Sequence, residues 1–171
     1  MSGSGARGGR SGSPARWGSL PLLPLLPFLP LLLSGCAGQR IEELRQQQLA
    51  EVRVAFDANL EAIRQRDVEG YLATYLDSPD FTYVGPGGTQ RGFAPFAAAR
   101  RASPEFPDSL TAGEPELVWL APGVVYAVYP FAARQGDSLG RGWSERIFVK
   151  SGRGWRIAVT SVIPEAGGGD R

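Results

Sequence analysis

Apolar positions recur at helical intervals across residues 41–66, a segment that contains neither glycine nor proline. Side chains spaced by three or four residues lie on one face of a helix, so the pattern predicts a long amphipathic helix with a single buried stripe. Asp67 is the expected N-cap of a second helix that stops before Ser78 and Pro79. The predicted stripe of the first helix consists of Leu49, Val52, Phe56, Leu60 and Ile63.

Beyond these helices the apolar period shortens to two, which is typical of strands. A glycine-rich turn at 85–88, a short third helix at 92–102 and a polar loop at 135–140 are expected between the strands. Helices followed by a run of antiparallel strands indicate an α+β fold, and a strongly curved sheet wrapped on one long helix leaves a cone-shaped cavity. The predicted strands are 80–84, 117–120, 124–134, 143–150 and 155–163.

The N-terminal part has a different pattern. Residues 1–19 contain arginine, glycine and serine but no acidic residue, and residues 20–33 are apolar with four prolines. That apolar run is shorter than the roughly 20 residues that span a bilayer. Positive charge, a short apolar segment and then small residues are typical of a cleaved export signal, predicted here to cover residues 1–35.

The end of this segment, Leu33-Ser34-Gly35-Cys36, resembles the lipobox of bacterial lipoproteins. The resemblance implies that Cys36 carries lipid and becomes the new N-terminus, with residues 36–40 as a short tether to the membrane. It places the protein at the bacterial cell envelope. Because Ala37 follows the cysteine, the expected site in an organism with two membranes is the outer membrane, facing the periplasm. A plain secretory signal is the alternative.

Composition narrows the chemistry further. The chain of 171 residues has no histidine and one cysteine, which excludes histidine-based triads, histidine metal sites and disulfide frameworks. The formal net charge is +1 and the arginines are scattered, so no nucleic-acid partner is expected. No metal and no cofactor is predicted.

Three segments of the chain occur in a recognisable order: FDANLEAIRQRDV at 56–68 with Tyr71-Leu72, FTYVGPGG at 81–88 with RGF at 91–93, and GWRI at 154–157. Together they resemble the nuclear-transport-factor-2-like superfamily, and the second and third resemble its SnoaL-like branch. The resemblance covers residues 41–165 and implies a cone-shaped roll, and the remaining residues 166–171 are expected to be a disordered tail. This fold hosts isomerases, cyclases, dehydratases, ligand carriers and dimerisation modules, so it does not by itself decide activity.

The resemblance also bears on catalysis. The tyrosine and the general base of the steroid isomerase branch fall at Asn59 and Gly85, and neither residue can do that acid–base work. The dehydratase branch needs histidine, which is absent. A second acid of the isomerase branch falls near Glu145.

Glu145 is therefore the candidate acid or base. If Trp143, Ile147 and Val149 face the cavity, strand alternation places Glu145 among them, where an apolar environment raises a carboxyl pKa. The alternative places Glu145 at the mouth of the cone, paired with an arginine such as Arg134 or Arg156.

The remaining candidates are ligand-binding residues of the cone. Tyr83 shares a strand face with Phe81, and Trp143 shares one with Glu145. Asn59 lies one residue off the helical stripe, where it either bonds a ligand or satisfies a neighbouring backbone group. The predicted ligand-binding set is Asn59, Phe81, Tyr83, Trp143 and Glu145.

Three functions follow from these observations. The first is a lipid-anchored protein that binds a small apolar or amphipathic molecule in the cone without catalysis. The alternative is a small-molecule isomerase, cyclase or dehydratase that uses Glu145, with Tyr83 or Asn59 as hydrogen-bond donor. The third is an assembly module that forms a homodimer through its sheet.

Overall fold

The computed structural model describes residues 29–165. The chain divides into two units between Cys36 and Ala37. The predicted signal segment up to residue 28 and the predicted tail at 166–171 lie outside the described residues. Helix α1 (Leu29–Gln65) begins earlier than predicted, so the backbone of the expected tether is helical. No helix in the described part of the chain is long and apolar enough to cross a membrane.

Two short helices follow α1, namely α2 (Val68–Ala73) and α3 (Phe93–Ala102). The predicted N-cap of α2 is confirmed, because the Asp67 carboxylate accepts a hydrogen bond of 2.9 Å from the Gly70 amide. Helix α2 ends earlier than predicted. The Thr74 carbonyl and the Leu76 amide bond to Ile157 at 3.0 and 2.9 Å, and these bonds to a strand replace further helical ones.

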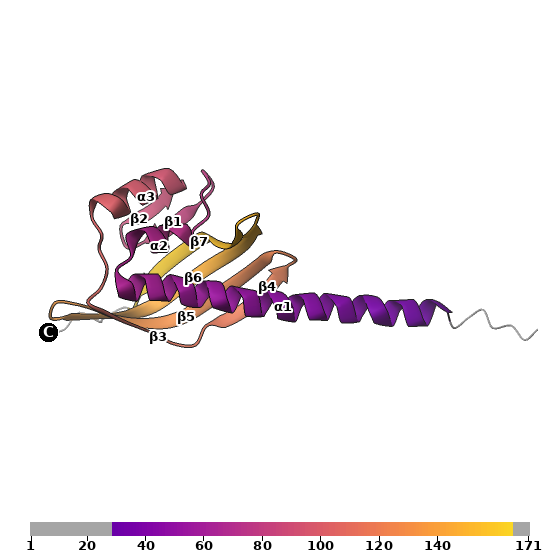
Figure 1. The fold of residues 1–171 in the computed structure, drawn as a ribbon. Helices are drawn as coiled ribbons and strands as arrows, with labels where there is room; N and C mark the ends of the chain where they lie inside the picture. Colours follow the sequence, from indigo (N-terminus) through magenta and orange to yellow (C-terminus); the bar gives the residue numbers. More distant parts are fainter. Residues whose placement is uncertain (1–28, 166–171) are drawn as a thin grey trace, which may run out of the picture. The chain divides into compact units, whose positions relative to one another are not determined.

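The seven strands form one curved, unclosed sheet, and the second unit is α+β as predicted (Figure 1). The order along the sheet is β2-β1-β7-β6-β5-β3, with β4 also paired to β5, and every pairing is antiparallel except that of β1 with β7. The strands are β1 (Thr82–Gly85), β2 (Gly88–Arg91), β3 (Ser109–Ala112), β4 (Glu116–Ala121), β5 (Val124–Gln135), β6 (Ser138–Ser151) and β7 (Gly154–Pro164).

The structure corrects three local predictions. The polar loop expected at 135–140 is a tight hairpin in which Gln135 pairs with Ser138, and Gly136 adopts φ +58° in the turn. Strands β2 and β3 were not expected, because each has only four residues and lacks a run of alternating apolar side chains. Pairing with β1 and β5 respectively holds them in the sheet.

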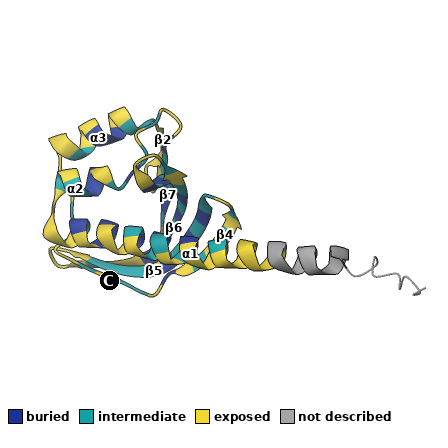
Figure 2. Cartoon of the chain, turned by 45° about the vertical axis from the view of Figure 1, so that its right-hand side comes forward, coloured by how far each residue is buried: buried dark blue, intermediate teal, exposed yellow. Residues whose placement is uncertain are grey.

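The two faces of the sheet are distinguished by β6. Buried and more exposed residues occur along this strand (Figure 2). Ser144, Arg146 and Phe148 are buried, whereas Trp143 and Glu145 are more exposed. The Arg146 guanidinium lies 5.3 Å from the centre of the Phe56 ring of α1. Even-numbered residues in this part of β6 therefore face the helices, and odd-numbered ones lie on the outer face.

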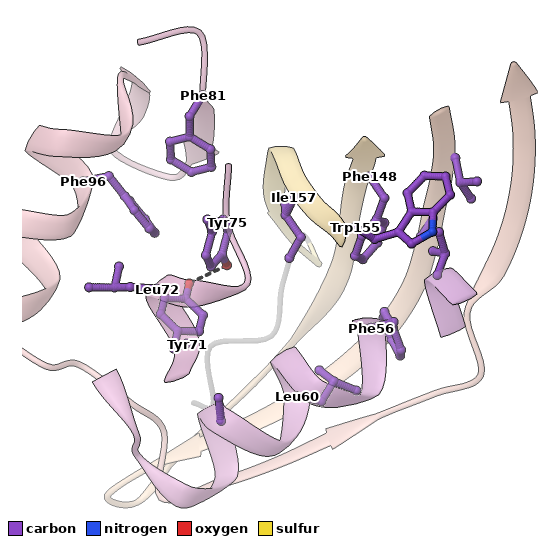
Figure 3. Packing of buried hydrophobic residues seen from close by; sticks show 14 of the residues in the cluster. Phe56, Leu60, Tyr71, Leu72, Tyr75, Phe81, Phe96, Phe148, Trp155 and Ile157 are labelled. Atoms are coloured by element: carbon purple, nitrogen blue, oxygen red, sulfur yellow. Dashed lines mark hydrogen bonds between the residues drawn. The ribbon is translucent and has the colours of Figure 1, made fainter. Parts of the chain in front are cut away.

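An aromatic cluster joins α2, α3 and β1 to this core (Figure 3). The Phe96 ring of α3 packs 4.8 Å from Phe81, 5.2 Å from Tyr75 and 5.8 Å from Tyr83, measured between ring centres. The Tyr75 hydroxyl donates a hydrogen bond of 2.7 Å to the Tyr71 hydroxyl. These contacts hold α3 over one end of the cone.

Candidate functional site

A cavity of about 170 Å³ lies inside the cone, between the helices and the inner face of the sheet. Most of its walls are apolar or aromatic, which is typical of small-molecule sites. The lining is Ile63, Tyr71, Tyr75, Tyr83, Arg100, Glu105, Phe106, Pro107, Leu110, Tyr129, Phe131, Ala133, Ser144, Arg146, Thr160 and Val162.

Arg146 is the charged group buried in this wall, with 4% of its surface exposed. Its Nη2 donates a short hydrogen bond to the Tyr129 hydroxyl, and its guanidinium lies 4.9 Å from the centre of the Tyr129 ring. Its Nε and Nη1 have no acceptor among residues 29–165, and no carboxylate in that part of the chain lies within ion-pair distance. A buried, permanently charged donor without a full set of acceptors is a costly arrangement.

Two tyrosines of the cavity, Tyr71 and Tyr75, are neutral hydrogen-bonding groups. Burial raises the pKa of the Tyr71 hydroxyl and raises that of Tyr75 further. Both phenols therefore remain protonated at neutral pH and offer hydrogen bonds instead of acting as bases. Near Tyr83, the Arg100 guanidinium lies 5.9 Å from the ring centre, which adds a second cation to the lining.

Three of the predicted ligand-binding residues, one on α1 and two in or beside β1, lie in different environments. Tyr83 lines the cavity. Phe81 is fully buried in the aromatic cluster and is not part of the lining. Asn59 is also fully buried, and its amide donates a hydrogen bond of 2.6 Å to the side-chain hydroxyl of Thr74, not to a backbone group. Its Oδ1 has no partner among the described residues.

Glu145 and Trp143 lie on the outer face of the sheet, so the expectation that they face the cavity is wrong. The Glu145 carboxylate accepts hydrogen bonds from the hydroxyls of Tyr126, at 2.8 Å, and Ser161, at 3.0 Å. Burial raises the pKa of the Tyr126 hydroxyl, and its hydrogen bond to the Glu145 carboxylate raises it further, to about 12. The error has a physical cause: Trp143, Ile147 and Val149 suggested an inward face, but the outer face of this sheet is apolar as well.

Arg146 is the residue that sequence reasoning missed. Arg146 and Phe148 are two residues apart on β6 and therefore share a face of the strand, which could have placed Arg146 inside the cone. An arginine in a strand is ordinarily taken as solvent-exposed. The assignment of Glu145 to the cavity placed its neighbour Arg146 on the wrong side.

A second hollow, of about 570 Å³, lies between helices α2 and α3 and the turn that joins β6 to β7. It is larger, but three of its charged side chains, Glu69, Arg101 and Arg156, already have partners. Arg101 bonds Glu69 at 2.7 and 2.8 Å, and Arg156 donates to the Trp155 carbonyl at 2.7 Å. The smaller cavity, with its incompletely bonded arginine, is therefore the stronger candidate site.

Neither a protein-family model nor a curated protein matches the sequence. Solved structures do match. A nuclear transport factor 2-like superfamily protein from Salmonella enterica has 19% identity, covers 73% of this chain and 96% of its own, and gives a TM-score of 0.60. The chain has the nuclear transport factor 2-like fold.

Other proteins of this fold show the same degree of similarity. A ketosteroid isomerase-like protein from Erwinia carotovora atroseptica has 19% identity and a TM-score of 0.60, with coverage of 70% of this chain and 97% of its own. A candidate scytalone dehydratase from Novosphingobium aromaticivorans has 10% identity and a TM-score of 0.60, with coverage of 73% and 89%. At these identities the similarity establishes the nuclear transport factor 2-like fold and leaves the activity to be argued from the site.

Proposed function

We propose that this protein is an exported, lipid-anchored carrier or receptor that binds a small amphipathic molecule in its cone, without catalysis. The cavity of about 170 Å³ carries the proposal. A dry cavity of about 150 Å³ is known to hold a benzene ring, so the ligand is of ring or short-chain size. Membership of the SnoaL-like branch is part of the same proposal.

The arrangement of acidic groups favours binding over catalysis. Glu145, the acid of the enzymatic alternative, lies across the sheet from the cavity and bonds Tyr126 and Ser161 there. The cavity carboxylate, Glu105, is exposed, and the buried phenols have raised pKa values. Among the described residues, the cavity therefore lacks a pair of side chains suited to act as general acid and general base.

Filling the cone should abolish binding. Ala133 lines the cavity on β5, so the replacement Ala133→Phe places a ring in the ligand's space. The expected result is loss of any small molecule that native mass spectrometry finds on residues 37–171, a unit that contains the whole hydrophobic core. The bound molecule is expected on the parent protein after expression in an exporting bacterium.

Ala132 provides the matched control for this test. It precedes Ala133 on β5 and is absent from the lining, so Ala132→Phe should leave the bound mass unchanged. Retention of the molecule in the Ala133→Phe protein would place the binding site elsewhere. A parent protein that never carries a small molecule and binds no small probe would count against the proposed function.

The anchor is tested separately on the full chain. Cys36→Ser removes the only cysteine, and the expected result is transfer of the protein from the membrane fraction to the soluble envelope fraction. Labelling with a clickable fatty acid should be lost in parallel. An unlabelled parent protein, or a variant that stays in the membrane fraction, would refute lipid attachment at Cys36.

The outer face of the sheet favours a second proposal, assembly as a homodimer. Trp143 is 46% exposed there, and Ile163, which pairs with it on β7, is 47% exposed. Contiguous apolar patches often mark interaction surfaces. The same native mass spectra report oligomeric state, and a monomer at high protein concentration would exclude this proposal.

A further inference from the structure

We infer that the ligand of the cone carries a carboxylate group that pairs with Arg146. This inference rests on the proposed binding function and names the class of ligand. Arg146 is 4% exposed, lines the cavity and has two guanidinium nitrogens, Nε and Nη1, without acceptors in the described part of the chain. An anion in the cavity would supply the counter-ion that the described part of the chain does not.

A guanidinium group keeps its charge in proteins, so burial is not relieved by loss of a proton. A buried charge needs either a counter-ion or strong hydrogen bonds. The Tyr129 hydroxyl and the faces of Phe56 and Tyr129 provide partial compensation. Glu105 lines the same cavity, but it is exposed and forms no ion pair with Arg146.

The hydroxyl groups around Arg146 are also suited to an anion. Tyr129 accepts a hydrogen bond from Arg146 and Tyr71 accepts one from Tyr75, so each retains its own proton for donation. No acceptor for either proton is found between residues 29 and 165. Tyr71, Tyr129 and Arg146 line the same cavity, and such donors suit the two oxygens of a carboxylate because charge-assisted hydrogen bonds are the strong ones.

The rest of the cavity limits the body of the ligand. Its volume of about 170 Å³ accommodates a group close to benzene in size. The walls near the aromatic cluster are apolar, with Ile63, Phe106, Leu110 and Phe131 among them. Arg146, the single buried cation among residues 38–165, suits a ligand with a single negative charge. The inferred class is therefore a monocarboxylate with an aromatic or short aliphatic body.

Benzoate and its neutral isostere benzamide test this inference by NMR titration on residues 37–171. The parent protein should bind benzoate more tightly than benzamide. Arg146→Met should weaken benzoate binding by about 10–100-fold, the range that loss of a charge-assisted hydrogen bond produces. Its effect on benzamide should stay within about threefold. Arg141→Met, at an exposed position on the same strand, should leave both affinities unchanged.

Arg146→Lys keeps the charge but removes the planar fork, and it should give an intermediate loss even if the methionine variant fails to fold. Equal binding of both probes, unaffected by either Arg146 variant, would overturn the carboxylate inference and leave the binding function standing. Binding of neither probe would count against both. Stabilisation by sodium chloride equal to that by benzoate, and dependent on Arg146, would indicate an inorganic-anion site and also overturn the inference.

Discussion

Replacing Arg146 by methionine is expected to stabilise the ligand-free protein, raising its free energy of unfolding by about 1–4 kcal/mol. Two opposing effects determine the sign of this change in the free energy of unfolding. Desolvation of a buried ion costs several kcal/mol. The compensating contacts that methionine would lose, a hydrogen bond to Tyr129 and ring contacts with Phe56 and Tyr129, are worth roughly 0.5–2 kcal/mol each. Methionine has a flexible, apolar side chain that fills similar space.

Urea denaturation followed by tryptophan fluorescence measures this effect on residues 37–171. Arg141→Met, at an exposed site of the same strand, should change the free energy by no more than about 0.5 kcal/mol. A loss of stability of more than about 1 kcal/mol in the Arg146→Met protein would show that the contacts of the guanidinium outweigh its desolvation. A stable variant that binds benzoate poorly would demonstrate a residue retained for binding at the expense of stability.

Replacing Phe96 by alanine is expected to have the opposite sign, lowering the free energy of unfolding by about 3–5 kcal/mol. Phe96 is 1% exposed and packs against the rings of Tyr75, Phe81 and Tyr83. Alanine would leave a cavity where α3 meets α2 and β1, and rigid aromatic neighbours fill such space poorly. The loss is a large share of the 5–15 kcal/mol that ordinarily stabilises a domain.

The same urea experiment tests this effect, with Val54→Ala as the control. Val54 is 70% exposed on α1, so its truncation should change stability by no more than about 0.5 kcal/mol. Phe96→Leu, which keeps most of the buried apolar area, should lose less than Phe96→Ala. Equal stability of the Phe96→Ala and parent proteins would mean that α3 does not depend on this ring for its attachment.

Sequence patterns predicted those parts of the fold in which local features, such as apolar spacing and helix caps, agree with what the structure buries and bonds. The α1 stripe at Val52, Phe56 and Leu60 is buried, and Asp67 caps α2. Strands β2 and β3 were missed because pairing with neighbours distant in the chain, and not their own side chains, makes them strands. Local sequence carries little of that information.

The candidate site was harder to predict, because it depended on which side of β6 faces inward. Both sides carry apolar residues, so alternation alone fixed the spacing of Glu145 and Arg146 but not their direction. Choosing the wrong side of β6 placed the acidic Glu145 in the cavity, where the structure has the basic Arg146. The missing information was the contact between Arg146 and Phe56 of α1, which only the tertiary structure provides.

If Cys36 carries the proposed lipid anchor, helix α1 sets the distance between the membrane and the cone. Residues 38–43 are exposed, and from residue 38 onward Gln48 is the first buried residue of this helix. At 1.5 Å per residue, the stretch from Ala37 to Gln48 lets the cone stand as far as about 17 Å from the point of attachment. Because the Debye length is about 8–10 Å at physiological ionic strength, negative lipid headgroups would exert little repulsion at that distance on an anion entering the cone.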